Sequence, residues 1–389
     1  MKKVMKVGIP KEIQEGETRV ALIPPSIKKI LKDNVEILVE AGAGEKAFWK
    51  DKDYTDAGAK IIEGPEALYN STDLIIKVRK PELNEKISEH EINLMKEGAV
   101  LVSMLQPATN IDTVKKLVSR KISAFSLDSL PRITRAQSMD VLSAMSTIAG
   151  YKSVLIAASH LPKFLPMFMT AAGTIAPAKV FIIGAGVAGL QAIATAKRLG
   201  AVVSAFDTRP VVKEQVESLG AKFVAVDLAG EETEGQSGYA KQVSKELQAK
   251  IAELTLKEVK KSDVVITTAQ VPGKRAPILI TESMVKEMQA GSVIVDLAAD
   301  QGGNCELTEM GSVVTKYSVT ICGFLNLPAS MPYHASQMFS KNMENVFSLI
   351  VKSGQINLDL NDEIIKGALI THQGVILQEN IKYLLSGMH

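Results

Sequence analysis

The sequence predicts an α/β protein with two doubly wound, parallel-sheet domains. Its 389 residues exceed what one hydrophobic core usually organises, which indicates at least two domains. Short apolar runs typical of buried strands alternate with helical patterns in the first half of the chain, and a second strand–helix series begins at Val180. Strands that alternate with helices form parallel sheets covered by helices on both faces.

The first series predicts a sheet and then a long helix. Its predicted strands are residues 6–10, 35–39, 73–78, 99–103 and 122–127, and its predicted helices are 25–32 and 111–120. In residues 137–161, Met139, Leu142, Met145 and Ile148 recur at helical spacing. We therefore expect one long helix that leaves the first domain.

The second series predicts another parallel sheet. Its predicted strands are residues 180–183, 202–206, 223–226, 264–267, 292–296 and 320–323. The apolar residues 167–169, which precede this series, are expected in the core. A later helix, 336–352, is expected to return to the first domain because its apolar face needs a partner. The predicted domains are thus 1–140 with 330–389, and 141–329.

Composition argues against several classes of function. Lys and Arg number 45 and Asp and Glu 43, so the net charge of +2 gives no reason to expect nucleic acid as a partner. The two cysteines cannot form a disulfide framework and fit a reducing compartment such as the cytoplasm. No transmembrane helix or direct membrane insertion is expected. The five histidines are scattered and neither cysteine has a second ligand at metal-site spacing, so no metal site is predicted.

The strongest local motif is Gly184-x-Gly186-Val187-x-Gly189, which follows an apolar strand and precedes a predicted helix at residues 190–199. In a dinucleotide site these glycines allow the tight turn, the approach of a pyrophosphate and close helix–strand packing, while the helix N-terminus faces the phosphates.

An acidic residue, Asp207, ends the next predicted strand eighteen residues after Gly189. Its carboxylate can accept both ribose hydroxyls of an adenosine and repels a 2′-phosphate, which favours NAD over NADP. Thr208 and Arg209 follow directly. The arginine could instead hold a 2′-phosphate, and this alternative stays open.

Two further segments carry chemistry. Residues 131–143 gather arginines, an amide, a carboxylate and hydroxyls at the start of the long helix; the candidate residues are Arg132, Ile133, Thr134, Gln137, Asp140 and Ser143. The alternative is a helix start capped by Thr134 or Ser138, with solvated arginines. Residues 296–304 follow a strand, and Asp300 could meet a ligand there or only cap the turn.

Together these segments resemble, over essentially the whole chain, the soluble NAD(H)-binding alpha subunit of proton-translocating NAD(P) transhydrogenase, in the split form. The most specific segments are residues 132–143 and 238–241. The other segments that carry the resemblance are 19–22, 171–174, 184–189, 206–209, 272–274 and 302–304.

The resemblance implies NAD(H) in a cleft between two Rossmann-like domains. The implied reaction is direct hydride transfer between NADH and NADP⁺, with NADP(H) on a partner subunit and coupling to proton translocation in the full complex. It further implies a homodimer with NADP(H)-binding and membrane-spanning partner subunits, peripheral on the cytoplasmic face of the membrane.

The resemblance also assigns roles to residues. Arg132, Gln137, Asp140 and Ser143 would line the nicotinamide as the predicted catalytic residues. Gly238 and Tyr239 would belong to a loop that closes over the nucleotide. Gln270 falls where the family often has leucine beside the adenine, which is a departure from its pattern.

The related family is alanine dehydrogenase. The alternative function is therefore that of an oxidative deaminase of the alanine dehydrogenase type. Its substrate handling uses an arginine, a lysine, an aspartate and a histidine, and Arg19, Lys77 and Asp300 stand at the first three places. Gln106 stands at the histidine place, and an amide cannot shuttle a proton as imidazole does. The substitution favours transhydrogenase. A non-catalytic NAD-binding module is a third hypothesis.

Overall fold

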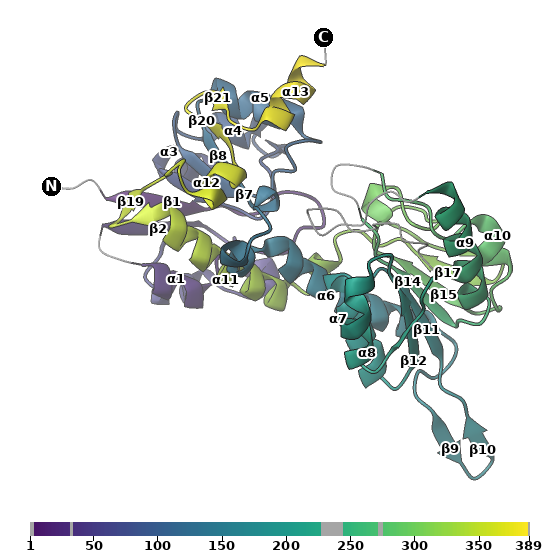
Figure 1. The fold of residues 1–389 in the computed structure, drawn as a ribbon. Helices are drawn as coiled ribbons and strands as arrows, with labels where there is room; N and C mark the ends of the chain where they lie inside the picture. Colours follow the sequence, from purple (N-terminus) through teal and green to yellow (C-terminus); the bar gives the residue numbers. More distant parts are fainter. Residues whose placement is uncertain (1–3, 32–33, 227–243, 271–274, 388–389) are drawn as a thin grey trace. The chain divides into compact units, whose positions relative to one another are not determined.

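The computed structural model describes residues 4–31, 34–226, 244–270 and 275–387. The chain divides into two compact units, Met1–Met145 with Ala329–His389 (unit 1) and Ser146–Pro328 (unit 2). Both units are α/β structures with largely parallel sheets (Figure 1), so the predicted fold class is confirmed.

Unit 1 is built on an eight-stranded sheet in the order β21-β20-β8-β7-β4-β1-β2-β3. The six strands from β8 to β3 are parallel, whereas β20 and β21 are antiparallel to their neighbours. The strands are β1 (Met5–Ile9), β2 (Val35–Glu40), β3 (Lys60–Ile62), β4 (Leu74–Ile76), β7 (Val100–Ser103), β8 (Ser123–Ser126), β20 (Leu369–His372) and β21 (Val375–Ile376).

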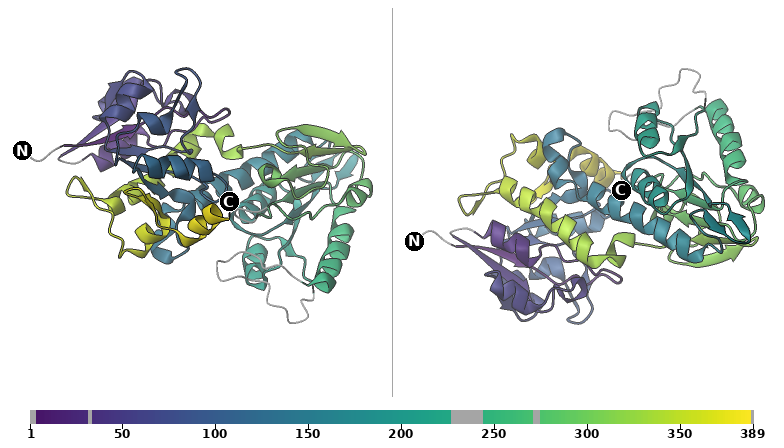
Figure 2. Two further views of the ribbon diagram at one scale, coloured as in Figure 1. Left: turned by 90° about the horizontal axis from the view of Figure 1, so that it is seen from above. Right: turned by 90° about the horizontal axis from the view of Figure 1, so that it is seen from below.

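The unit 1 sheet is completed and covered by the C-terminal part of the chain. Helix α11 (Pro332–Ile350) packs beside α1 (Pro24–Ile30), as the view from below in Figure 2 shows. Phe339 and Met343 of α11 are fully buried. The remaining elements of unit 1 are α2 (Asp51–Asp56), α3 (Pro65–Ser71), α4 (Glu91–Leu94), α5 (Ile111–Ser119), α12 (Glu363–Ala368), α13 (Glu379–Ser386), the 3-10 turns η1 (Glu45–Ala47), η2 (Leu127–Ser129) and η3 (Thr134–Met139), and the short strands β5 (Leu83–Asn84), β6 (Glu89–His90), β18 (Val351–Lys352) and β19 (Gln355–Ile356). The 3-10 turn η6 (Leu327–Ser330) contains the boundary between the two units.

The predicted start of the long helix at Gln137 is wrong. Residues 134–139 form the turn η3, and Asp140 leaves the helical region with φ −73° and ψ 92°. The Asp140 carboxylate accepts hydrogen bonds from the backbone N–H (2.9 Å) and the hydroxyl (2.6 Å) of Ser143. This is the bonding of an N-cap residue, and helix α6 (Val141–His160) therefore begins one residue later.

Among the described helices, α6 is the one that is long and apolar enough to cross a membrane by length and composition. Its most apolar 18-residue window has a mean hydropathy of 1.4, and 44% of that window is buried. Val154, Ile156 and Ala157 belong to the apolar core of unit 2. Burial in the core of unit 2 thus explains the apolar composition of the C-terminal half of α6.

Unit 2 contains a seven-stranded sheet in the order β13-β12-β11-β14-β15-β17-β16, parallel except for β16. The strands are β11 (Lys179–Ile183), β12 (Val202–Phe206), β13 (Lys222–Phe223), β14 (Val264–Thr267), β15 (Val293–Asp296), β16 (Val313–Lys316) and β17 (Val319–Cys322). One apolar cluster joins the sheet to α6, α7 (Val187–Arg198) and α8 (Lys213–Ser218), and another joins it to α9 (Lys245–Val259) and α10 (Glu282–Lys286). The helices thus cover both faces, as a doubly wound sheet requires.

Residues 167–169 are exposed, so the expectation that they lie in the core is wrong. They enter the hairpin of β9 (Phe168–Thr170) and β10 (Gly173–Ile175), which projects from the rest of unit 2 (Figure 1). Met169 is 77% exposed and Phe168 42%. A two-stranded hairpin has no second layer against which to bury its apolar side chains.

Candidate functional site

Three glycines shape the turn between β11 and α7. Gly184 has φ +96°, in the left-handed region, and a Cβ there would lie 2.4 Å from Oγ1 of Thr268. A Cβ on Gly189 would lie 1.8 Å from the carbonyl oxygen of Gly184. Both glycines are therefore required by the packing of the protein itself.

Gly186 differs from the other two glycines because a Cβ there would meet no described atom closer than 3.9 Å, at Nη2 of Arg209. Its φ of −74° is open to any residue. Gly186 precedes the first residue of α7, Val187, and the helix start has no side-chain cap. The space beside Gly186 and the N–H groups of the first helical turn fit an anion such as a pyrophosphate.

Asp207 follows the last residue of β12 and lies next to this turn. Its carboxylate accepts hydrogen bonds from the backbone N–H of Ala185 (2.8 Å) and of Arg209 (2.9 Å). The guanidinium of Arg209 adds two bonds, from Nε (2.9 Å) and Nη2 (2.8 Å). Asp207 thus lies where a ribose-binding acid is expected, but its carboxylate is paired with Arg209. Thr208, between the two residues, is half-buried.

A second carboxylate organises the end of β15. Asp296 is buried, and the sequence reasoning missed it as an organising residue. It accepts hydrogen bonds from the hydroxyls of Thr267 and Thr308 and the backbone N–H groups of Ala298, Asn304 and Cys305. The sequence signal for it is an aspartate at the end of a strand that is followed by a glycine pair. The glycines let the chain turn back against the carboxylate: a Cβ on Gly303 would lie 2.9 Å from Oδ2 of Asp296.

Four more residues of the range 146–328 are predicted to belong to the site: Gln270, Asp300, Gly238 and Tyr239. Asp300 is exposed, in the 3-10 turn η5 (Ala299–Gln301). Gln270 is exposed and donates a hydrogen bond to the carbonyl oxygen of Leu297 (2.7 Å). Gly238 and Tyr239 lie outside the described residues.

The segment 132–143 of unit 1 exposes its polar groups on a fixed backbone. Two amides of α11, from Asn342 (2.9 Å) and Asn345 (3.1 Å), donate to the carbonyl oxygen of Ser138. Of the predicted residues, Arg132, Thr134 and Gln137 are exposed, and Ile133, Asp140 and Ser143 are half-buried. Among these, the structure brings Asp140 and Ser143 together, with Asp140 as the helix cap.

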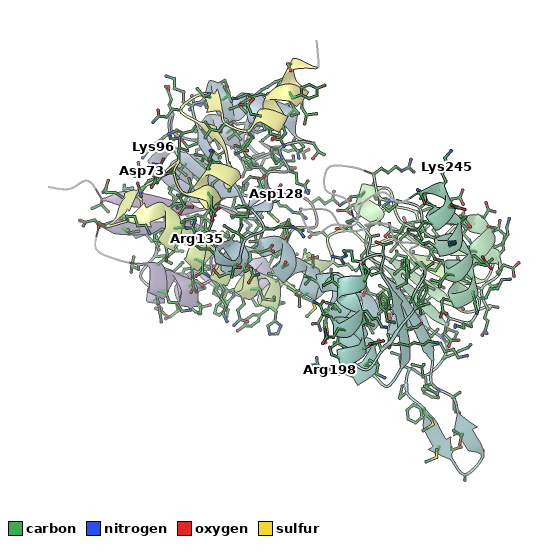
Figure 3. The ribbon with its side chains drawn as sticks, viewed as in Figure 1. Asp73, Lys96, Asp128, Arg135, Arg198 and Lys245 are labelled. Carbon is green, nitrogen blue, oxygen red and sulfur yellow. The ribbon has the colours of Figure 1, made fainter. Side chains whose placement is uncertain are left out.

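Neither Thr134 nor Ser138, the alternative caps, caps this helix, and Arg135 is more than a solvated arginine. Arg135 forms a bidentate ion pair with Asp362 (2.6 and 3.0 Å), which itself caps α12. Figure 3 labels Arg135 among the side chains of unit 1. The pair ties the 132–143 segment to the C-terminal part of the chain.

At the predicted alanine dehydrogenase positions, Arg19 is buried and engaged by a carboxylate of the chain. Glu17 accepts from Nε (2.7 Å) and Nη2 (2.6 Å) of Arg19 and from Nε of Arg79 (2.9 Å). Burial raises the pKa of Glu17, but the hydrogen bond and charge of Arg19 and the charge of Arg79 outweigh it and lower the pKa to about 2.

Lys77 is engaged in the same way. Its ammonium donates to both oxygens of Glu91 (2.7 and 2.6 Å), and the two side chains are each 1% exposed. Burial raises the pKa of the nearby Glu12 to about 7, against the opposing charge of Lys77. The sequence reasoning missed Glu12, Glu17 and Glu91 because a glutamate in a polar stretch is usually a surface residue.

Gln106 lies on an exposed turn with φ +47°. Its backbone N–H donates to Asp128 (3.0 Å), as does that of Leu105 (2.8 Å), and Asp128 is labelled in Figure 3. The turn thus presents an amide that cannot titrate, where alanine dehydrogenase is expected to have an imidazole.

The chain matches one family along nearly its whole length. Residues 8–149 match the N-terminal domain described as "Alanine dehydrogenase/PNT" and residues 153–379 the corresponding C-terminal domain.

Three relatives illustrate the similarity within this family. The chain is 47% identical over 376 residues to a chain of NAD(P) transhydrogenase subunit alpha from Rhodospirillum rubrum, covering 96% of this chain and 98% of the relative. It is 33% identical to alanine dehydrogenase of Staphylococcus epidermidis over 84% of this chain and 82% of that one. Among solved structures, the transhydrogenase of Sinorhizobium meliloti has a TM-score of 0.82 at 39% identity and covers 96% of this chain and 99% of its own.

The glycine turn yields a paired prediction. Gly186→Ala should leave the melting temperature within about 2 °C, because its backbone suits any residue, yet weaken NADH binding at least about tenfold because the methyl group fills the space beside the turn. Gly189→Ala should cost about 2–4 kcal/mol of stability, because its methyl group collides with the Gly184 carbonyl. Thermal unfolding and nucleotide fluorescence titration measure the two effects. Equal melting temperatures for the two variants would contradict the assignment.

The buried carboxylates of unit 1 yield a prediction about pH. The pKa of Glu17 is lowered from 4.5 to about 2, so its ion pairs contribute about 3 kcal/mol above pH 4.5, which is lost as pH falls toward 2. Glu12 has the opposite sign: its raised pKa means that stability falls as pH rises from 4.5 to about 7.

Melting temperatures from about pH 3 to 8 measure both slopes in matched variants. Glu17→Gln should flatten the loss below pH 4.5 and lower stability at neutral pH, whereas Glu12→Gln should flatten the loss between pH 4.5 and about 7. Parallel pH profiles for wild type and both variants would show that these groups do not titrate as described.

Proposed function

Because the chain belongs to the alanine dehydrogenase/PNT family, we propose that it is the NAD(H)-binding alpha subunit of an NAD(P) transhydrogenase. The overall reaction is NADH + NADP⁺ ⇌ NAD⁺ + NADPH. The observation that carries the choice within the family is the exposed amide of Gln106, which cannot exchange the proton that oxidative deamination requires. The higher identity to the transhydrogenase relatives supports the same choice.

The NAD(H) site is the turn between β11 and α7 together with the end of β12. Gly186 leaves room for the pyrophosphate, and the first N–H groups of α7 would donate to it. Asp207 would accept the ribose hydroxyls of the adenosine. Gln270, Thr208 and the segment with Gly238 and Tyr239 are assigned to this site by the family resemblance.

The nicotinamide would be oriented by Arg132, Gln137, Asp140 and Ser143 of unit 1. When bound, NADH supplies a hydride directly to NADP⁺, and this transfer needs no general acid or base, only close approach of the two nicotinamide carbons. The capping bonds from Ser143 to Asp140 fix that carboxylate, and α11 fixes the backbone at Ser138. The four residues thus position the ring and move no proton.

The reaction requires partners that this chain does not contain. NADP(H) would be held on a partner subunit, and a membrane-spanning subunit would couple the reaction to proton translocation. The subunit would then lie on the cytoplasmic face of the membrane through these partners. The name of its relatives, subunit alpha, supports the existence of further subunits.

We also propose that the subunit is a homodimer held through the β9–β10 hairpin. Phe164, Met167, Phe168, Met169 and Ile175 are between 42% and 77% exposed. So many apolar side chains on the hairpin and in the segment just before it exceed the scattered exposure of a monomer surface and indicate a protein contact. A second copy of the hairpin offers a matching apolar surface, as a two-fold interface requires.

Oxidative deamination remains the second candidate, favoured by Arg19, Lys77 and Asp300 at the positions of alanine dehydrogenase. The two cations, Arg19 and Lys77, are paired with Glu17 and Glu91 through bonds of 2.6–2.7 Å, so a substrate carboxylate would have to displace a buried glutamate. We therefore expect no appreciable turnover with pyruvate, ammonia and NADH. Turnover with these substrates would overturn the transhydrogenase assignment.

The activity test uses the NADP-binding partner. NADH-driven reduction of an NADP⁺ analogue should appear when the partner subunit is added and be absent without it. Gln137→Asn should slow this reaction about tenfold and change NADH affinity less than about twofold, because its amide orients the ring. Gln215→Asn, on the exposed surface of α8, is the matched control and should change neither quantity. A large loss of NADH affinity in Gln137→Asn would show that this residue binds rather than orients.

The dimer test changes one exposed methionine at a time. Met169→Asp should raise the dimer dissociation constant at least about tenfold, because it places a charge in an apolar contact. Met310→Asp, at a position of unit 2 that is also exposed, should leave the dimer intact. Sedimentation velocity measures both. A monomeric wild type, or equal effects of the two substitutions, would contradict the interface.

A further inference from the structure

The carboxylate of Asp207 has a hydrogen-bond donor at each of its lone-pair positions. Oδ1 accepts from N and Nε of Arg209, and Oδ2 accepts from N of Ala185 and Nη2 of Arg209. A carboxylate offers about four such positions. No acceptor position is therefore left for the two hydroxyls of a ribose while this arrangement holds.

The four bonds differ in how easily they can be exchanged. The two from backbone N–H groups hold the carboxylate against the glycine turn and depend on the fold of unit 2. The two from the guanidinium break when the side-chain torsions of Arg209 change, and this side chain is 16% exposed. A ribose diol can therefore replace the guanidinium without moving the carboxylate.

The guanidinium also borders the space where the nucleotide phosphates would lie. A Cβ built on Gly186 would be 3.9 Å from Nη2 of Arg209, its nearest described atom. Once displaced from Asp207, Arg209 keeps its charge and stays tethered two residues away. A guanidinium at this place suits a 2′-phosphate, which it can bind in a bidentate manner.

We propose, on the basis of the NAD(H) site proposed above, that Asp207 and Arg209 together set the selectivity of this site for NAD(H) over NADP(H). Asp207 reads the ribose diol and repels a 2′-phosphate, and it also restrains the arginine that would bind that phosphate. Arg209 could thus bind a 2′-phosphate, but its ion pair with Asp207 keeps the guanidinium away from that phosphate. Selectivity for NAD(H) is therefore a property of the ion pair and not of the aspartate alone.

The test compares NADPH and NADH dissociation constants in the full chain, by isothermal titration. Their ratio cancels whatever Arg209 contributes to the pyrophosphate that both nucleotides share. Asp207→Asn should lower the ratio at least about tenfold, because repulsion is lost and Arg209 is released. Arg209→Gln should raise it at least about threefold, because a ligand of the 2′-phosphate is removed. The double variant should have a ratio at least about tenfold above that of Asp207→Asn, because Arg209 is no longer present.

Arg198→Gln is the matched control, with the same charge change at the exposed end of α7 (Figure 3). It should leave the ratio unchanged. Equal ratios in Asp207→Asn and the double variant, or equal effects of Arg198→Gln and Arg209→Gln, would overturn the proposal. If the wild-type chain binds neither nucleotide, the proposed function itself fails, and that result is distinct from either. Because Arg209→Gln removes no core residue, it keeps the test decisive if an Asp207 variant does not fold.

Discussion

The close contact between Gly189 and the carbonyl of Gly184 is the constraint on which the candidate nucleotide site depends. It fixes the start of α7 against the end of β11, so that the next N–H, of Ala185, meets Asp207 from the neighbouring strand. A similar contact, between Gly150 of α6 and the carbonyl of Ala188, packs a second helix on the same turn. Backbone packing thus places the acid, the helix start and the bare Gly186 together before any ligand is considered.

In unit 1, charged side chains pair with one another inside the protein and are not left open to a ligand. There the ionisable groups are turned toward one another: Arg19 and Lys77 are neutralised by Glu17 and Glu91 inside the protein. Removing one partner of such a pair leaves an unpaired buried charge, so the two members of each pair persist together. Arg19 and Lys77 are thus held by the protein itself, whatever chemistry the turn of Gln106 carries.

The fold class was predictable from the sequence because strand–helix alternation and the glycine motif are local patterns. The family was predictable because its most specific segments, residues 132–143 and 238–241, are contiguous in the sequence. Both predictions are confirmed. The start of α6 was misplaced because apolar periodicity continues through η3, whereas the boundary depends on one carboxylate, Asp140. The exposure of residues 167–169 was missed because an apolar run looks the same in a core and on a hairpin. The pairing of Asp207 with Arg209 depends on side-chain torsions, which no sequence spacing specifies; the site roles stay predictions.

The division of unit 1 between the two ends of the chain has a consequence for how the protein is made. Strand β8 gains its antiparallel neighbour β20, and α1 its neighbour α11, only from residues that leave the ribosome after the whole of unit 2. Unit 2 is contiguous and can fold while translation continues. Until the segment Ala329–His389 emerges, the sheet of unit 1 has an open edge at β8, and an unpaired edge of this kind is prone to pairing with neighbouring chains.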